Sequence, residues 1–224
     1  MAEKHPSGIE QRIVDKVVAR RGRLHAFESL DPKRTALVVV DLDLGTGRDD
    51  KARVAAIAEK VNSLSSSLRQ RGGVVAWVTT PIEHASENFR AVFGDAAADR
   101  YEADALSGKA TTVWPELLVD EADMHTVKRG HSAFFPTRCD VHDRLQTAGI
   151  EYLLIVGAVT NICCEASARD AAELGYKVTM VSDALIGWSA EQDAATFATF
   201  FRCYGDVRPT ADALELMDHS LVER

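Results

Sequence analysis

The stretch from Tyr152 to Asp183 constrains the fold of this chain more than any other. An apolar run of strand length over 152–158 is followed by a short turn. Next come an alanine-rich run that ends at Gly175 and a β-branched run that ends at Asp183. This succession of strand, turn, helix and strand is typical of a βαβ unit, which pairs parallel strands.

The rest of the chain repeats this alternation of apolar strands and amphipathic helices. Further strands are expected over 35–41, 74–79 and 124–128, with an edge strand near Val207, and further helices over 51–71, 140–149, 190–203 and 210–217. Nearly continuous β-branched runs indicate strands that are buried on both faces. We therefore predict an α/β fold with a single doubly wound, Rossmann-like, mostly parallel sheet and helices on both faces.

Residues 1–30 are expected to form an N-terminal helical extension ahead of one domain over 31–224. Apolar residues at helical spacing between positions 8 and 22 predict an amphipathic helix. From Met1 to His25 there are six Lys or Arg against three Asp or Glu, whereas the whole chain has a formal charge of −8. This basic extension is expected to lie on the domain or on a neighbouring subunit, with a solvated helix as the alternative.

Two other segments suggest contacts beyond the sheet. Residues 84–121 have weak periodicity, and long irregular segments in compact domains are often functional, so we expect a lid or an oligomer contact with small helices. The helix over 190–203 is apolar on more than one face because it contains Phe197, Phe200 and Phe201. A partner subunit is expected to cover it, so this segment predicts a homo-oligomer.

The composition excludes several classes of protein. A charge of −8 without a basic stripe argues against nucleic-acid binding, and no apolar run approaches the roughly 20 residues of a membrane span. The first residues lack an apolar signal core, and the four cysteines form no CxxC pair, so a reducing cytoplasm is expected. The histidines show no metal-ligand spacing, so no metal site is expected.

Three chemically complementary side chains follow the ends of predicted strands. Asp41 ends the first strand, Lys128 ends the third, and the pair Cys163–Cys164 precedes the helix after 152–158. The carboxyl ends of parallel strands share one edge, so these groups should converge. A carboxylate can move the thiol proton, an ammonium favours a thiolate, and amides at a helix start can hold an oxyanion. The set predicts acyl transfer from an amide through a thioester, without a cofactor.

Each residue alone has an ordinary structural interpretation. Aspartates at strand ends often only cap turns, lone lysines are mostly solvated, and Cys163 and Cys164 could both be small buried hydrophobic residues. Gly45 and Gly47 allow a phosphate-loop interpretation, but no GxxxxGK[ST] is present and GxGxxG is incomplete. Nucleotide binding is therefore the weaker alternative, and the expected convergence of the three groups favours catalysis.

The order of these motifs resembles that of the isochorismatase-like cysteine hydrolases, which include nicotinamidase, N-carbamoylsarcosine amidohydrolase and ureidoacrylate amidohydrolase. The likeness is carried by the strand over 35–41, by Lys128 followed by Ser-Ala-Phe over 132–134, and by GAVTNICCEASARDA over 157–171, with Asp183 at the matching place downstream. The resemblance implies a small amide or carbamoyl (ureido) substrate, no cofactor, and a homodimer or homotetramer.

The resemblance also implies residue roles. Asp41 would be the general acid/base, Lys128 the electrostatic partner, and Cys163, rather than Cys164, the nucleophile. The amides of Thr160 and Cys163 would form the oxyanion hole, next to a cis peptide bond between Val159 and Thr160.

The chain departs from the family pattern after Asp41. Members commonly continue with Met-Gln-Asn-x-Phe, whereas residues 42–47 read LDLGTG, and the metal-binding residues of nicotinamidases are not evident. Asp43 could raise the pKa of one carboxyl group of the Asp41–Asp43 pair, or it could bind a cationic group of a substrate. Trp77, Trp114 and Phe134 are expected as apolar pocket walls, with ordinary core packing as the alternative.

Two other functions compete with amide hydrolysis. True isochorismatases cleave a vinyl ether, a reaction that needs no thiol, so the combination of carboxylate, ammonium and thiol argues against it. A non-catalytic binding or assembly subunit with the same fold is the second alternative, motivated by the altered stretch after Asp41.

Overall fold

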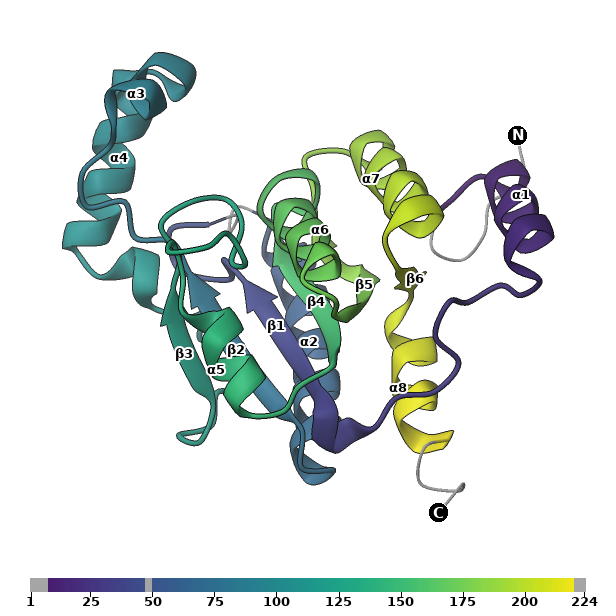
Figure 1. Cartoon of the computed structure of the whole chain (residues 1–224). Coiled ribbons are helices and arrows are strands. Elements are labelled where there is room, and N and C mark those ends of the chain that lie inside the picture. Colours follow the sequence, from purple (N-terminus) through teal and green to yellow (C-terminus); the bar gives the residue numbers. More distant parts are fainter. Residues whose placement is uncertain (1–7, 47–49, 220–224) are drawn as a thin grey trace.

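The fold is built on one parallel sheet (Figure 1). The computed structural model describes residues 8–46 and 50–219, and all the strands within these ranges belong to this sheet, in the order β3-β2-β1-β4-β5-β6. They are β1 (Thr35–Val40), β2 (Val74–Thr79), β3 (Met124–Val127), β4 (Tyr152–Ala158), β5 (Lys177–Ile186) and β6 (Asp206–Arg208). The predicted doubly wound fold is confirmed.

Helices cover both faces of the sheet. On one face lie α1 (Gln11–Arg21), α5 (Val141–Thr147), α6 (Glu165–Glu173) and α7 (Ala190–Cys203), and on the other lie α2 (Lys51–Gln70) and α8 (Thr210–His219). Successive residues of a strand point to opposite faces, so Val38 of β1 packs in the first core and Val39 in the second. Because both faces are covered, β1 is buried along its whole length, as its continuous apolar run predicts.

The segment over 84–121 forms small helices, as expected. Helices α3 (Glu87–Phe93) and α4 (Asp95–Leu106) make an arm that projects from the body of the domain (Figure 1). The chain then returns through the 3₁₀ turn Lys109–Thr111, and its backbone pairs with the loop after β1 through an isolated bridge between Asp43 and Val113. The arm is therefore connected directly to the edge of the sheet where β1 ends.

The aromatic face of α7 is covered by α1 of the same chain. Phe200 and Phe201 share a core with Val17 of α1, and the guanidinium of Arg21 lies 5.0 Å from the Phe201 ring centroid. These phenylalanines are already buried within the single chain, so they give no separate support for a partner subunit on α7. The predicted homodimer or homotetramer remains a prediction from the family resemblance.

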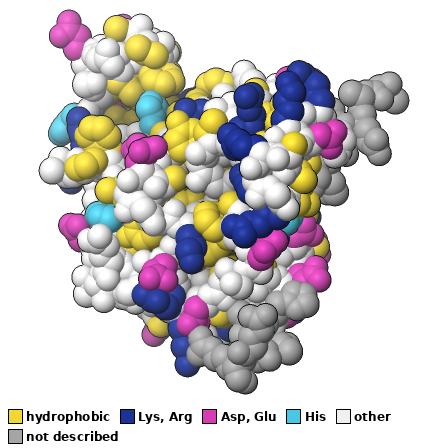
Figure 2. Space-filling view, turned by 45° about the vertical axis from the view of Figure 1, so that its right-hand side comes forward, with side chains coloured by type: hydrophobic (Ala, Val, Ile, Leu, Met, Phe, Trp, Pro, Cys, Tyr) yellow, Lys and Arg dark blue, Asp and Glu magenta, His cyan; other side chains and the backbone are white. Residues whose placement is uncertain are grey.

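A buried carboxylate attaches this extension to the sheet. Asp206 of β6 accepts hydrogen bonds from the backbone amides of Ala26, at 2.7 Å, and Phe27, at 3.0 Å, and it forms an ion pair of 3.3 Å with Arg21. Basic side chains gather on the outer surface over α1 (Figure 2). The extension thus adds positive charge to one side of an acidic protein while its apolar face stays inside.

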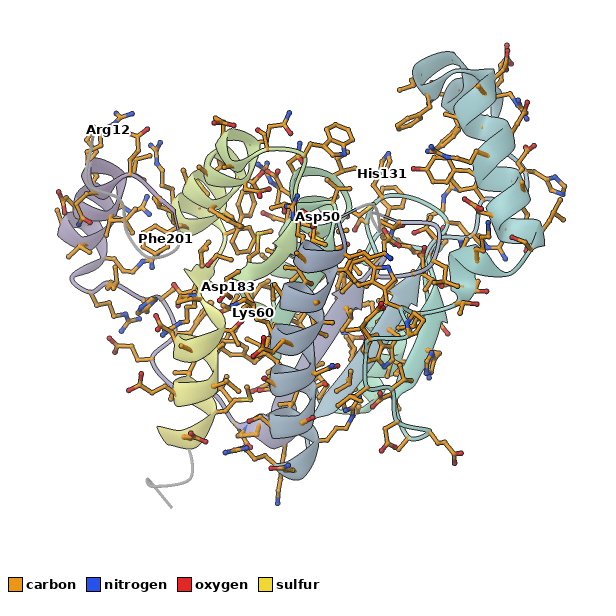
Figure 3. All side chains as sticks on the ribbon, turned by 180° about the vertical axis from the view of Figure 1, so that it is seen from behind. Arg12, Asp50, Lys60, His131, Asp183 and Phe201 are labelled. Carbon is orange, nitrogen blue, oxygen red and sulfur yellow. The ribbon has the colours of Figure 1, made fainter. Side chains whose placement is uncertain are left out.

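Asp183 has a structural position away from the predicted catalytic groups. It lies in β5, where the pairing with β4 is irregular, and its carboxylate lies 2.9 Å from Lys60 of α2 (Figure 3). The same carboxylate accepts hydrogen bonds of 2.7 Å from the amide and hydroxyl of Thr210, where α8 begins. Asp183 therefore connects β5 to the two helices on one face.

None of the helices in the described part of the chain has the length and apolar character of a membrane span.

Candidate active site

The candidate site lies where the winding of the sheet reverses, beyond the ends of β1 and β4. Neighbouring strands turn away from each other at such a point, which leaves a crevice at their carboxyl ends. Gly157 allows the two strands to approach closely here, because it has a φ of 124° and a Cβ at this position would lie 2.0 Å from the carbonyl oxygen of Val40. Any larger residue would push the two strands apart at the site.

Asp41 is held firmly at the end of β1. Its backbone is in the left-handed region, with a φ of 52°, which aspartate tolerates better than most residues and which occurs often at functional sites. Its amide donates to the carbonyl of Val78 in β2, and one carboxylate oxygen accepts a hydrogen bond of 2.6 Å from the hydroxyl of Thr80. The other carboxylate oxygen is left for the neighbouring ammonium group.

Lys128 joins Asp41 to the thiol of Cys163. Its Nζ lies 2.8 Å from the Asp41 carboxylate and 3.3 Å from the Cys163 sulfur, and it donates a third bond to the carbonyl of Gly130. Burial lowers the pKa of Lys128, but the charge of Asp41 and, next, the interaction with Cys163 raise it by more. The net effect is a raised pKa, so the ammonium group stays charged. The predicted convergence of Asp41, Lys128 and Cys163 is therefore present in the structure.

Burial and Asp41 act on the pKa of the Cys163 thiol in the opposite direction to Lys128. Burial, followed by the charge of Asp41, raises the pKa of Cys163 to about 12, and Lys128 only partly offsets these effects. The surroundings therefore favour the protonated thiol in the free protein, and Lys128 is the group that favours the thiolate. Cys164 is fully buried and packs in the core beside α6, as predicted for the second cysteine.

The turn between β4 and α6 presents the thiol. It runs over Thr160–Cys164 as one turn of π-helix, in which the amides of Ile162 and Cys164 both donate to the carbonyl of Val159. The cis peptide bond lies between Ala158 and Val159, one residue earlier than predicted, because β4 ends at Ala158 and the chain changes direction there. Thr160 and Cys163 stand in this same turn, and their amides remain the predicted oxyanion hole.

Asp43 occupies the loop after β1 and lines the pocket. Its Oδ1 accepts hydrogen bonds from the Gly45 amide at 2.9 Å and the Thr46 hydroxyl at 3.2 Å. Burial, and next the charge of Asp41, raise the pKa of Asp43 to about 7. Gly45 therefore donates to a carboxylate, which disfavours the phosphate-loop interpretation, while Gly47 lies outside the described residues.

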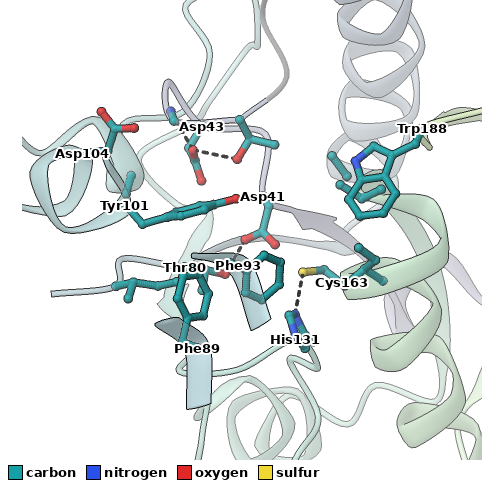
Figure 4. Close-up of a pocket in the computed structure, with 17 residues that line it drawn as sticks. Asp41, Asp43, Thr80, Phe89, Phe93, Tyr101, Asp104, His131, Cys163 and Trp188 are labelled. Atoms are coloured by element: carbon teal, nitrogen blue, oxygen red, sulfur yellow. Dashed lines mark hydrogen bonds between the residues drawn. The ribbon is translucent and has the colours of Figure 1, made fainter. Parts of the chain in front are cut away.

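The cavity above the thiol has a volume of about 140 Å³, which suits a small molecule (Figure 4). Asp41, Asp43 and Cys163 line it together with aromatic side chains that the sequence did not identify. Those aromatic residues are Phe89 and Phe93 of α3, Tyr101 of α4, and Trp188 before α7. Phe89, Phe93 and Tyr101 stand in the segment of weak periodicity, and Trp188 lies between two predicted elements, so no local pattern indicated that they line a pocket.

The predicted apolar walls are core residues instead. Trp77 packs in the second core, and its indole nitrogen donates to Asp123 at 2.7 Å, at the opposite end of the sheet. Trp114 is buried beneath the loop and donates to the backbone carbonyl of Asp43, and Phe134 packs in the first core. None of the three lines the cavity, so their assignment to the substrate pocket is wrong. A tryptophan in mid-strand cannot reach the strand end where the substrate would bind.

His131 is a pocket residue that the sequence prediction missed. It lies in the loop after β3, and its Nδ1 is 3.9 Å from the Cys163 sulfur (Figure 4). Partial burial and then the charge of Lys128 lower the pKa of His131, so the imidazole is neutral at pH 7. Its position three residues beyond Lys128 is the signal that could have found it. In residues 8–46 and 50–219, no cluster of three or more His, Cys, Asp or Glu side chains is arranged to hold a metal.

The sequence identifies the class of protein to which this fold and site belong. The Isochorismatase domain family matches residues 35–212, which is most of the chain. The chain therefore belongs to the isochorismatase family of hydrolases, as the resemblance implied.

Individual relatives agree with this assignment. The chain is 28% identical to the uncharacterized isochorismatase family protein YwoC of Bacillus subtilis (strain 168) over 191 residues, covering 84% of this chain and 96% of that protein. A cysteine hydrolase from Pseudomonas syringae pv. phaseolicola 1448A has the same fold, with a TM-score of 0.78 and 21% identity over 88% of this chain and 98% of its own. N-carbamoylsarcosine amidase from Thermoplasma acidophilum also shares the fold, with a TM-score of 0.63 and 19% identity. The match covers 79% of this chain and 96% of that protein's chain.

Proposed function

We propose that this protein is a cysteine-dependent amidohydrolase that cleaves a C–N bond of a small amide or carbamoyl compound. The single observation that carries the proposal is the chain of contacts from Asp41 through Lys128 to Cys163, with Asp41 and Cys163 in the lining of the pocket. These groups match the roles that an acyl transfer needs: a proton carrier, a fixed positive charge and a nucleophile.

The raised pKa of Cys163 supports a first step that begins from the thiol. When the sulfur attacks the amide carbon, the thiol proton moves to Asp41, and the negative charge passes to the carbonyl oxygen. The amides of Thr160 and Cys163 are proposed to hold that oxygen. Asp41 then gives the proton to the leaving nitrogen, the C–N bond breaks, and the acyl group remains on Cys163 as a thioester.

Water completes the cycle through the same carboxylate. Asp41 takes a proton from water as the water oxygen attacks the thioester carbon, the C–S bond breaks, and the proton returns to sulfur as the acid product leaves. Lys128 stays charged throughout and compensates the negative charge that shifts between Asp41 and the reacting groups. The net reaction consumes one amide and one water and releases one acid and one amine or ammonia.

The thiol also bears on the choice between this reaction and the vinyl-ether hydrolysis of true isochorismatases. A vinyl ether is protonated on carbon and hydrolysed without a nucleophilic sulfur. The contact of 3.3 Å between Lys128 and the Cys163 sulfur would then serve no step. The arrangement therefore supports amide hydrolysis over that alternative.

The direct test is to trap the acyl-enzyme. The protein is mixed with a panel of primary amides and ureido compounds, released ammonia is measured, and samples quenched in acid are examined by intact-protein mass spectrometry. We expect ammonia release from at least one compound and an adduct on the peptide that contains Cys163. Cys163→Ala should abolish both signals, whereas Cys164→Ala, the matched control one residue away, should keep the adduct. Ammonia release that survives Cys163→Ala would contradict the proposal.

A further inference from the structure

The pocket has an acidic end on the side of the arm. Asp43 is 3% exposed, yet it lines the cavity, and Asp104 of α4 lines the same region. A Cβ placed on Gly45 would lie 3.2 Å from the Oδ1 of Asp43 and 3.8 Å from the Cβ of Asp104. The two acidic side chains therefore lie on either side of Gly45, close enough that a side chain at this position would crowd Asp43.

Only one of the two oxygens of the Asp43 carboxylate accepts hydrogen bonds from the described residues. Both of its hydrogen bonds, from Gly45 and Thr46, go to Oδ1, and no donor in the described part of the chain reaches Oδ2. The charge of Asp41 repels that of Asp43, and Lys128, which attracts it, is already paired with Asp41. A buried carboxylate in this situation is stabilised by any cation that enters the cavity.

Aromatic rings line the same cavity. Phe89 stacks on Phe93 with ring centroids 4.4 Å apart, and Tyr101 meets Phe89 edge to face at 5.5 Å. Trp188 lies across the cavity from Tyr101 (Figure 4). Aromatic faces attract cations, and carboxylates combined with aromatic rings recognise alkylammonium groups.

The described residues that line the cavity include three aspartates and no lysine or arginine. His131 is the remaining basic side chain in the lining, and it is neutral at pH 7 because its pKa is lowered. Asp41 is paired with Lys128, and Asp104 is paired with Lys109 at 3.6 Å, whereas Asp43 has no ion-pair partner among the described residues. A substrate that carries a carboxylate would therefore meet repulsion from Asp43 without a lysine or arginine in this lining to offset it. The lining therefore separates substrates by the sign of their charge.

We propose that this pocket selects small amides that carry a cationic alkylammonium group, held between Asp43, Asp104 and the aromatic rings of the arm while Cys163 attacks the amide. The proposal rests on the amidohydrolase function proposed above and specifies its substrate class. Asp43 acts as a specificity residue through its charge and takes no part in proton transfer.

Three probes of nearly equal size test the charge preference. They are 2-(trimethylammonio)acetamide, its neutral isostere 3,3-dimethylbutanamide, and the anionic amide succinamate. Dissociation constants are measured by calorimetry with the Cys163→Ala variant, which holds the amide without turning it over. We expect the cation to bind at least about tenfold more tightly than the neutral isostere, from one charge pair and the aromatic contacts, and succinamate to bind most weakly.

Substitutions then locate the preference. Asp43→Asn keeps an acceptor for Gly45 and Thr46 but removes the charge, and it should reduce the ratio of cationic to neutral affinity roughly tenfold. Asp104→Asn should reduce it by a smaller factor. Asp99→Asn, on the same helix but 67% exposed and paired with Arg90, is the matched control and should leave the ratio unchanged.

The outcomes separate this inference from the proposed function. Charge selection is overturned if Asp43→Asn leaves the ratio of cationic to neutral affinity unchanged, or if succinamate binds most tightly. Either result overturns it even if all three amides are hydrolysed. Tight, Asp43-dependent binding of the cation, with no ammonia released from any probe by the protein with Cys163 intact, supports charge selection and overturns the hydrolase proposal.

Discussion

The Nζ atom of Lys128 lies 2.8 Å from the carboxylate of Asp41, and the lysine side chain is fully buried. A buried ion pair contributes little net stability when both partners are present, but removing one partner leaves an uncompensated charge. Asp41→Asn should therefore lower the free energy of unfolding by about 3–5 kcal/mol as well as abolish turnover. Lys128→Met added to Asp41→Asn should restore most of the stability and none of the activity.

Urea unfolding of the two single variants and the double variant measures this coupling. Asp99→Asn is the control because it removes a carboxylate from an exposed ion pair, and it should cost less than about 1 kcal/mol. If the double variant were as unstable as the sum of the single variants, Asp41 and Lys128 would not interact as the structure indicates.

The thiol of Cys163 should react slowly in the free protein and faster once Asp41 is gone. Burial and Asp41 raise its pKa to about 12, so little thiolate exists at pH 7. Asp41→Asn removes the repelling charge and leaves Lys128 beside the sulfur, so the pKa should fall. Alkylation with iodoacetamide, followed by peptide mass spectrometry, should show Cys163 labelling more slowly than the exposed Cys203 in the unsubstituted protein. In Asp41→Asn the order should reverse, and fast labelling of Cys163 before substitution would refute the neutral thiol.

The raised pKa of Asp43 should appear in the pH dependence of stability. Because its folded-state pKa, about 7, lies above the unfolded value of 3.8, the folded protein binds this proton more tightly. Stability from this group is present below pH 3.8 and is lost as the pH rises to about 7. Asp43→Asn has no carboxyl group to titrate and avoids this loss. Between pH 4 and pH 7 its free energy of unfolding should therefore rise relative to that of the unsubstituted protein by up to about 4 kcal/mol, or about 1.4 kcal/mol per pH unit. Thermal unfolding at several pH values measures the difference, and a constant difference would contradict it.

Asp206 should be essential for attaching the N-terminal extension. Asp206→Ala removes the acceptor for the amides of Ala26 and Phe27 and the partner of Arg21, so we expect a loss of about 3–5 kcal/mol. Limited proteolysis should then cut first between α1 and β1. Asp15→Ala, an exposed change on α1, should shift stability by less than about 0.5 kcal/mol and leave the cleavage pattern unchanged.

Much of this architecture could be predicted from the sequence because its strands are buried on both faces. Continuous β-branched runs, as in β1 and β4, have few alternatives to a parallel sheet. Once the sheet is parallel, residues that follow its strands must meet at one edge, which is why Asp41, Lys128 and Cys163 could be placed together from positions 87 and 35 residues apart.

The walls of the pocket could not be predicted in the same way. Phe89 and Tyr101 belong to two short helices whose direction is set by tertiary contacts, such as the pairing of Val113 with Asp43, and no local pattern reveals those contacts. Trp77 misled the prediction because large aromatic residues are common both in pockets and in cores. The charge state of Cys163 depended on how deeply the turn is buried, which only the folded structure supplies.

The arm formed by α3 and α4 has an evolutionary consequence. The groups proposed for bond cleavage stand at the ends of buried strands, whereas Phe89, Phe93, Tyr101 and Asp104 stand on a projecting appendage. Mutations in the arm can change which molecules the pocket binds while leaving the groups at the strand ends and the folding of the sheet nearly unchanged. Proteins with this arrangement can therefore evolve new substrate preferences through sequence changes confined to α3 and α4. Arms grafted from distant family members would be a practical starting point for directed evolution.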